Sequence, residues 1–227
     1  MAGGGENGRR RTDGGPRAIV FDLGNVVLDV DFARVLRAWS RASGVPLADI
    51  APRFSVDEAY RRFERGEMAP AEYHRHICDT LGIGLSSTDF EQGWNAIFGG
   101  LVPGIEPVLR SLSGRITIAC FTNTNEVHKR RWSELYAGTM ALFDRVFVSS
   151  DMGCRKPDEA AFMRVATELG ADPTELLFFD DHPDNVAGAR RCGYDEVLVT
   201  SVQDVQTALR SRGLDGTGRW SRGDVGR

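Results

Sequence analysis

Polar side chains follow short apolar runs at four places along this 227-residue chain. They are Asp22 in AIVFDLG, Thr122 and Asn123 in IACFTNTN, Lys156 in GCRKPDE, and Asp180 and Asp181 in LLFFDDHP. Carboxylates that lie side by side repel each other unless a cation lies between them. Oxygen ligands are also what Mg²⁺ prefers in proteins. If these places meet in the fold, the sequence therefore predicts a Mg²⁺ site beside a hydroxyl group and an ammonium group.

The elements that must bring these residues together are five short, strongly apolar runs, each typical of a strand covered on both faces. They are Ala18 to Phe21, Ile116 to Phe121, Val146 to Val148, Leu176 to Phe179, and Val197 to Val199. Helical stretches separate the later runs, for example PDEAAFMRVATELG, in which Phe162, Val165 and Leu169 share one face. This alternation predicts a Rossmann-like, doubly wound α/β fold with about five parallel strands. Ligands of such sheets bind at the carboxyl ends of the strands, where the polar residues are expected.

The segment between the first two strands differs from the rest of the chain. About 65 residues from Phe32 to Phe98 show no strand pattern, and Phe32, Val35 and Trp39 share a helix face. We therefore predict a helical insert at residues 33–100 and a sheet-bearing core domain at residues 17–32 and 101–212. We expect Trp39 and Trp94 to pack in the core of the insert. The Gly- and Arg-rich ends, residues 1–16 and 213–227, are predicted to be flexible tails.

Composition excludes several function classes. A net charge of −4 and a pI near 5.6 argue against nucleic-acid or anionic-membrane partners, and they favour a small molecule. The four cysteines form no C-x-x-C pair, so neither a zinc site nor a disulfide framework is expected. No run of 18 apolar residues occurs, and the basic N-terminus lacks the apolar stretch of a signal peptide. We expect a cytoplasmic monomer or homodimer.

The four motifs, in this order, resemble those of the haloacid dehalogenase-like hydrolase superfamily over about residues 17–212. More narrowly, FDLGNVVLDVDF, ERGE, GW, TNTN and RKP with FFDD and DN look like bacterial phosphatases of glucose 1-phosphate and related sugar phosphates. The resemblance implies a Mg²⁺-dependent phosphatase whose substrate is a phosphomonoester of a sugar, a cyclitol or a similar biosynthetic intermediate. It also implies that residues 33–100 are a helical cap over the site.

The resemblance implies a role for each motif as well. Asp22 would attack phosphorus and form an aspartyl-phosphate, with Lys156 as the second catalytic residue. Asp22, the Gly24 carbonyl and Asp181 would hold Mg²⁺. The phosphate would be bound by Thr122, Asn123 and Lys156. Taken singly, Thr122 is also a common helix N-cap, and Lys156 is typical of a loop before a helix.

Gly24 is where the sequence departs from many phosphatases of this superfamily, which carry a second aspartate there as a general acid. Such an acid contributes roughly 10²- to 10⁴-fold to the rate. Its absence suits an anomeric phosphate, whose leaving oxygen is less basic, unless His182 or Glu64 supplies the proton. Two alternatives stay open. A 2-haloacid dehalogenase also lacks the second aspartate, although Asp180 and Asp181 would have no purpose there, and the fold could serve as a non-catalytic binding module.

Overall fold

The structure of the chain is a computed structural model that describes residues 15–214. The predicted flexible tails therefore fall almost entirely outside the described residues. Within residues 15–214, no helix is both long enough and apolar enough to cross a membrane.

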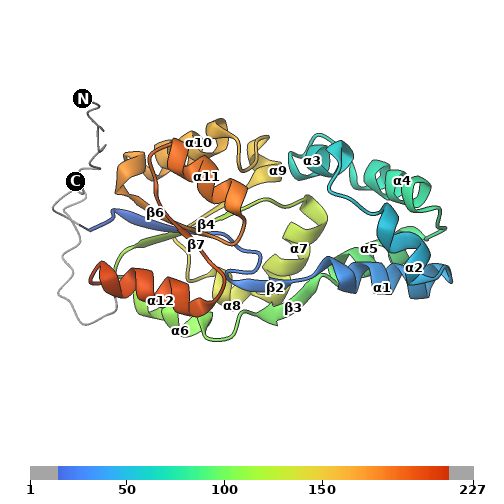
Figure 1. Cartoon of the computed structure of the whole chain (residues 1–227), viewed down its shortest axis with the longest axis horizontal. Helices are drawn as coiled ribbons and strands as arrows, with labels where there is room; N and C mark the ends of the chain where they lie inside the picture. The colour runs from blue at the N-terminus through green and yellow to red at the C-terminus, as the bar shows by residue number, and fades with distance from the viewer. Residues whose placement is uncertain (1–14, 215–227) are drawn as a thin grey trace, which may run out of the picture.

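A five-stranded parallel sheet forms the centre of the molecule, with strand order β5-β4-β1-β6-β7 (Figure 1). Its strands are β1 (Ala18–Phe21), β4 (Thr117–Thr122), β5 (Arg145–Val148), β6 (Leu176–Asp180) and β7 (Asp195–Leu198). β1 pairs with β4 on one side and with β6 on the other, and all four of its residues are buried. Each predicted strand lies within two residues of the observed one, so the predicted Rossmann-like α/β fold is confirmed.

Helices cover both faces of this sheet because side chains alternate between the faces along each strand. Ile19 and Phe21 point to the face covered by α6 (Ile105–Leu112), α7 (Glu126–Leu135) and α12 (Val202–Ser211). Val20 points to the opposite face, where α10 (Glu159–Leu169) and α11 (Pro183–Arg191) pack. Two further short helices, α8 (Ala137–Met140) and α9 (Ser149–Met152), flank β5, and the 3-10 turn η2 (Pro173–Glu175) precedes β6.

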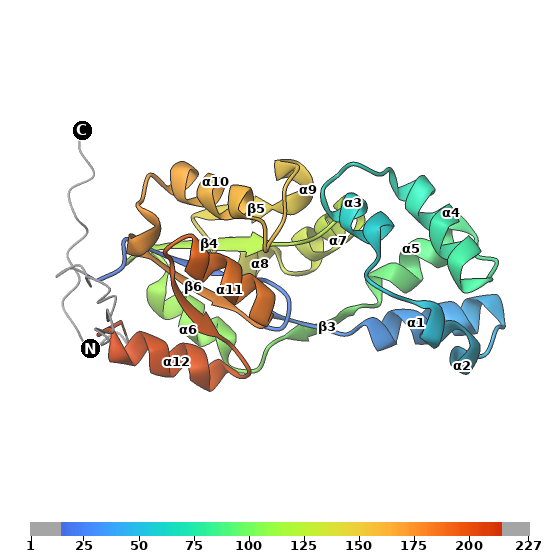
Figure 2. The same cartoon turned by 45° about the horizontal axis from the view of Figure 1, so that its top comes forward.

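The insert forms its own helical layer beyond one end of the sheet, as Figures 1 and 2 show. Its elements are α1 (Phe32–Ser43), α2 (Leu47–Ile50), the 3-10 turn η1 (Ala51–Arg53), α3 (Glu58–Glu64), α4 (Pro70–Leu81) and α5 (Ser87–Asn95). The insert has its own core, in which the rings of Trp39 and Trp94 are fully buried and stacked, 5.5 Å apart between centroids. The prediction that both tryptophans pack in the core is confirmed.

Two short strands connect the insert to the sheet-bearing part. β2 (Leu28–Val30) pairs antiparallel with β3 (Phe98–Leu101), and the polypeptide enters the insert after one and leaves it through the other (Figure 2). The sequence analysis did not predict these two strands, which lie on either side of the segment from Phe32 to Phe98 and share only Phe98 with it. Each strand has only three or four residues, and the FGGL of β3 contains two glycines, which have low strand propensity. The exact boundaries at residues 33 and 100 stay a prediction.

Candidate active site

Lys156 lies at the centre of a buried cluster of charges at the carboxyl edge of the sheet. Its Nζ donates to Asp22 Oδ1 at 2.7 Å, to Asp180 Oδ2 at 2.6 Å and to the Phe121 carbonyl at 2.8 Å. The side chains of Lys156 and Asp180 are 1% and 0% exposed, and that of Asp22 is 11% exposed. Asp22 directly follows β1, and Asp180 ends β6, so neighbouring parallel strands deliver both carboxylates to one point.

Burial and charge act on these groups in opposite directions. Burial raises the pKa of Asp22 to about 7, against the opposing effect of the Lys156 ammonium. Burial alone would lower the pKa of Lys156, but the charges and hydrogen bonds of Asp180 and Asp22 outweigh it and raise that pKa. Lys156 is therefore a permanent cation, whereas Asp22 gains from any additional positive charge that approaches its free oxygen.

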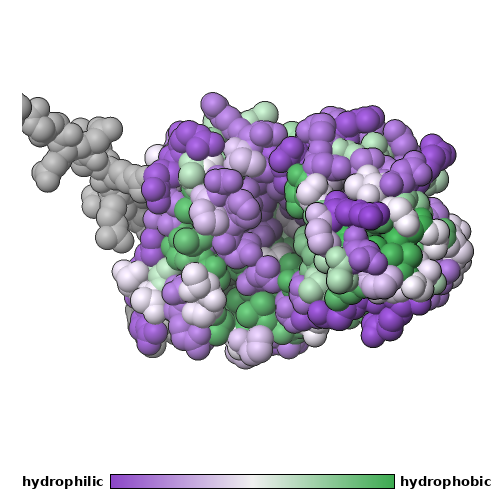
Figure 3. Space-filling view, turned by 45° about the vertical axis from the view of Figure 1, so that its right-hand side comes forward, coloured by the Kyte–Doolittle hydropathy of each residue, from purple (hydrophilic) through white to green (hydrophobic). Residues whose placement is uncertain are grey.

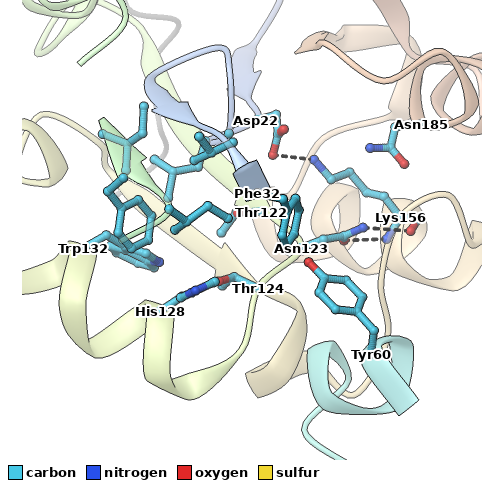
Figure 4. Close-up of a pocket in the computed structure, with 16 residues that line it drawn as sticks. Asp22, Phe32, Tyr60, Thr122, Asn123, Thr124, His128, Trp132, Lys156 and Asn185 are labelled. Atoms are coloured by element: carbon cyan, nitrogen blue, oxygen red, sulfur yellow. Dashed lines mark hydrogen bonds and ion pairs between the residues drawn. The ribbon is translucent and has the colours of Figure 1, made fainter. Parts of the chain in front are cut away.

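Asn123 fixes the backbone of Lys156. Its Oδ1 accepts from the Lys156 N–H at 2.9 Å, and its Nδ2 donates to the Lys156 carbonyl at 2.9 Å, as the paired dashed lines in Figure 4 show. The Asn123 side chain thus pairs with both the N–H and the C=O of Lys156, as a neighbouring strand would, and it holds the loop that carries Lys156. The sequence indicated only the Asn123 N–H as a phosphate ligand and missed this second use, which joins residues 33 positions apart.

Thr122 is the last residue of β4, and it is buried beside Asp22 in the same pocket. The alternative role of Thr122 as a helix N-cap is wrong. α7 begins at Glu126, and Asn125 is its N-cap, with a side chain that accepts from the His128 N–H. Thr122 therefore does not cap a helix; it lies at the end of β4, before the loop that leads to α7.

Three carboxylates lie close enough together to bind one cation. One oxygen each of Asp22, Asp180 and Asp181 lies within 4.8 Å of the others. Asp180 is already engaged, because it also accepts from the His182 N–H at 2.8 Å and from Asn185 Nδ2 at 3.0 and 3.1 Å. Asp22 and Asp181 keep accepting capacity, and hard oxygen donors of this kind suit Mg²⁺. The donor set therefore fits the predicted metal.

Asn25 connects the loop after β1 to the metal-binding edge. Its Nδ2 donates to Asp181 Oδ2 at 3.1 Å, and its Oδ1 accepts from the Val30 N–H at 3.1 Å. Asn25 is also the residue of this loop with a left-handed backbone, at φ 52°. Gly24 does not have a positive φ, so its backbone conformation suits other residues as well, and an added Cβ would lie 3.2 Å from Val30 Cγ2, a tight contact that Val30 must relieve by moving a few tenths of an ångström.

A pocket of about 120 Å³ lies between this edge of the sheet and the insert. Its polar end holds Asp22, Thr122, Asn123, Lys156 and Asn185 (Figure 4). Apolar side chains form most of the remaining wall, namely Leu23, Leu28, Val30, Phe32, Ile97, Phe98 and the ring of Trp132. Figure 3 shows the surface hollowed between the sheet-bearing part and the insert, with apolar residues in green close to the hollow.

Comparison with known proteins decides the family. A family model described as a haloacid dehalogenase-like hydrolase matches residues 16–193. The chain belongs to the haloacid dehalogenase-like hydrolases. This confirms the family that the four motifs indicated.

Relatives of this hydrolase include named phosphatases. Phosphatase MT3486 of Mycobacterium tuberculosis is 29% identical over 200 residues, which cover 80% of this chain and 86% of that protein. Sesquiterpene phosphatase astK of Aspergillus oryzae is 26% identical over 205 residues, covering 88% and 97%. A Bacteroides thetaiotaomicron enzyme of the same family, solved with magnesium and inorganic phosphate, shares the fold with a TM-score of 0.72 at 22% identity, covering 82% and 96%. The relatives indicate that this hydrolase acts on phosphoric monoesters, as predicted.

Another buried network ties the hydrolase core to its insert. Trp94 Nε1 donates to Asn125 Oδ1 at 3.3 Å, and His128 Nε2 lies 3.0 Å from the Trp94 carbonyl. The carbonyl only accepts, so His128 donates through Nε2 and its Nδ1 accepts from Asn125 Nδ2 at 3.2 Å. Burial lowers the pKa of His128 to about 4, so this imidazole is neutral. Sequence reasoning missed this network because its partners are 31 to 34 residues apart.

The two residues named as possible proton donors do not reach the reacting centre. His182 is exposed, and its ring accepts from the Asp184 N–H at 3.3 Å at the start of α11. Glu64 is buried and forms an ion pair with Arg155 at 2.9 Å. Neither is among the described residues that line the pocket. Neither residue therefore replaces the general acid that is missing at Gly24.

Proposed function

We propose that the protein is a Mg²⁺-dependent phosphatase that hydrolyses a phosphomonoester through an aspartyl-phosphate on Asp22. The observation that carries this proposal is the state of the Asp22 carboxylate. Lys156 fixes Oδ1 at 2.7 Å, in the described part of the chain no hydrogen bond reaches Oδ2, and Asp22 lines the pocket. One oxygen is held and the other is free to attack, as nucleophilic catalysis requires.

The reaction takes two displacements at phosphorus. Asp22 Oδ2 forms a bond to phosphorus while the bond to the leaving oxygen breaks, and the electron pair goes to that oxygen, which then takes a proton. Water next attacks phosphorus and loses a proton to solvent, the bond between phosphorus and Asp22 breaks with its electron pair returning to the carboxylate, and inorganic phosphate leaves. Lys156 keeps the carboxylate oriented through both steps and neutralises charge on the phosphoryl oxygens.

The phosphoryl group would be bound by the loop that follows β4. Thr122 and Asn123 line the pocket together with Lys156, so the Thr122 hydroxyl and the Asn123 N–H would donate to the phosphoryl oxygens, and the Asn123 side chain holds the lysine backbone beside them. This arrangement combines two neutral donors with one fixed cation. It favours an anionic group with several oxygens over a neutral ligand.

Mg²⁺ would be held by Asp22, the Gly24 carbonyl and Asp181, and it would neutralise the repulsion between the nucleophile and the phosphate. Asp180 would not bind the metal. It is saturated by Lys156, His182 and Asn185, so it orients the lysine.

For the alcohol part of the substrate, we propose a sugar or a sugar-like metabolite such as a cyclitol, on the basis of the sequence resemblance. A second candidate is the phosphate of an apolar alcohol. It is favoured by the apolar wall of the pocket and by the similarity to a sesquiterpene phosphatase. A 2-haloacid dehalogenase has less support, because the carboxylate cluster has no use when a halide leaves. A cytoplasmic location, and a monomer or homodimer without nucleic-acid or membrane partners, stay predictions.

A metabolite panel tests this proposal. Purified protein is assayed with glucose 1-phosphate, glucose 6-phosphate, an inositol phosphate, farnesyl monophosphate and 2-chloropropionate, each in EDTA and in excess Mg²⁺. We expect phosphate release only with Mg²⁺ and only with Asp22 present, with Asp22→Asn as the control. Turnover of 2-chloropropionate in EDTA would favour the dehalogenase, and inactivity on every compound would favour the binding module.

A further inference from the structure

Tyr60 of α3 enters the pocket from the insert. Among the described residues of the insert, it is the one polar side chain that lines the pocket. The close-up shows its hydroxyl pointing toward Asn123, at the polar end of the pocket (Figure 4). Gly24 offers no carboxylic acid, and the Tyr60 hydroxyl is the donor that the insert contributes to the pocket.

The ring of Tyr60 is held by aromatic neighbours. Its centroid lies 5.9 Å from that of Phe32, 6.1 Å from that of Trp94 and 6.2 Å from that of Tyr73, with edge-to-face geometry in each case. The side chain is 8% exposed. Such packing leaves the ring one position, so its hydroxyl is presented to the pocket at a defined place.

Glu64 and Arg155 hold α3 against the core from the other side. Glu64 lies one turn after Tyr60 on the same helix, where its carboxylate is a hydrogen-bond acceptor for the Tyr60 hydroxyl. Glu64 Oε2 also accepts from Arg155 Nε at 2.9 Å. Arg155 directly precedes Lys156. At Gly66 the insert approaches the core so closely that an added Cβ would lie 2.4 Å from the Ser150 carbonyl. The ion pair therefore docks the helix that carries Tyr60 next to the lysine loop.

We propose that, when substrate binds, the Tyr60 hydroxyl turns its O–H from Glu64 to the leaving oxygen of the substrate, and that Glu64 is a positioning residue that holds α3 and Tyr60 in place through its ion pair with Arg155. This inference rests on the proposed phosphatase function.

The chemistry is stabilisation of charge and not proton transfer. Burial, together with the charge of Glu64, raises the pKa of Tyr60 well above its ordinary value, so the phenol keeps its proton at working pH. As the bond to phosphorus breaks, its electron pair moves to the leaving oxygen, which the phenol O–H stabilises until solvent water supplies the proton. A hydrogen bond to a developing charge of this kind corresponds to roughly ten- to hundredfold in rate.

A series of aryl phosphates tests the proposal, because the phenols differ in basicity while the substrates keep nearly the same shape. The series is 4-nitrophenyl, phenyl and 4-methoxyphenyl phosphate, and kcat/KM reports the step in which the leaving bond breaks. We expect Tyr60→Phe to lower kcat/KM at least tenfold for phenyl and 4-methoxyphenyl phosphate but less than threefold for 4-nitrophenyl phosphate. The matched control is Tyr73→Phe, which removes a buried hydroxyl that has no hydrogen-bond partner among the described residues and does not line the pocket.

Glu64→Gln tests the positioning step. We expect it to steepen the dependence of kcat/KM on phenol basicity in the same direction as Tyr60→Phe. Glu91→Gln is the control, because it breaks the exposed insert-to-core pair between Glu91 and Arg130, and we expect no change of slope. An equal loss on all three esters, or an unchanged slope in Tyr60→Phe, would overturn the inference. The proposed function is judged separately, since it requires only that wild type is active and Asp22→Asn is not.

Discussion

Replacement of Lys156 by methionine perturbs the site most directly, because it removes the one ammonium that serves two buried carboxylates. Asp22 and Asp180 each lie within 2.7 Å of Nζ, and Asp180 is fully buried. Breaking a buried pair in this way leaves uncompensated charge and costs about 3–5 kcal/mol. For a chain of this size, each kcal/mol shifts the melting temperature by about 2–4 °C. We therefore expect Lys156→Met to melt about 6–20 °C below wild type.

The assay is thermal unfolding followed by circular dichroism at neutral pH in EDTA, so that no divalent cation replaces the ammonium. Lys129→Met is the matched control. Lys129 pairs with Asp151 at 2.6 Å, but their side chains are 39% and 54% exposed, and an exposed pair contributes at most about 1 kcal/mol.

A second variant isolates the electrostatic cause. Adding Asp180→Asn to Lys156→Met removes one of the two carboxylates that the lysine leaves behind, so we expect the double variant to recover part of the lost stability. The reasoning is refuted if the melting temperature of Lys156→Met is no lower than that of the Lys129→Met control. It is also refuted if Asp180→Asn destabilises the Lys156→Met variant as much as it destabilises wild type.

Two further outcomes follow from the structure. His128 has a pKa lowered to about 4 by burial, and in the unfolded chain it protonates near 6.5, so its contribution is complete above pH 6.5 and is lost as the pH falls toward 4. Over that range, the free energy of unfolding of wild type should fall by up to about 3 kcal/mol more than that of His128→Gln, as measured by urea unfolding at each pH. Parallel curves of unfolding free energy against pH for the two proteins would contradict this. Wild type should hydrolyse glucose 1-phosphate about a hundredfold faster than glucose 6-phosphate in kcat, because Gly24 offers no general acid. Gly24→Asp should raise the slower rate at least tenfold once Val30 yields a few tenths of an ångström, and equal wild-type rates would refute the leaving-group argument.

The sequence predicted the position of the site well because strand ends are local features. Asp22, Thr122 and Asp180 each close an apolar run, and parallel strands in one sheet must bring such residues to the same edge. The family motifs then connected Lys156 to them. These features needed only the pattern of each run and the order of the runs along the chain.

The contacts that hold the site together could not be predicted in the same way. The two hydrogen bonds between the Asn123 side chain and the Lys156 backbone join residues 33 positions apart. The ion pair between Glu64 and Arg155 joins residues 91 positions apart. Their sequence signals are single polar residues in loops or on helix faces, which are common in any chain. The start of α7 could not be placed from the sequence for a related reason: TNTN offers four possible N-caps in succession, and Asn125 is the one that caps the helix and also contacts Trp94.

The central claim is that Asp22 attacks phosphorus, and one measurement tests it most directly. The protein is mixed with a turnover substrate and Mg²⁺, quenched in acid within milliseconds, digested, and its peptides are mapped by mass spectrometry. We expect a hydroxylamine-sensitive phosphoryl group on the peptide that contains Asp22, absent from folded Asp22→Asn, which should also show no turnover. A phosphoryl group on another residue, or a folded Asp22→Asn variant that still releases phosphate, would contradict the account.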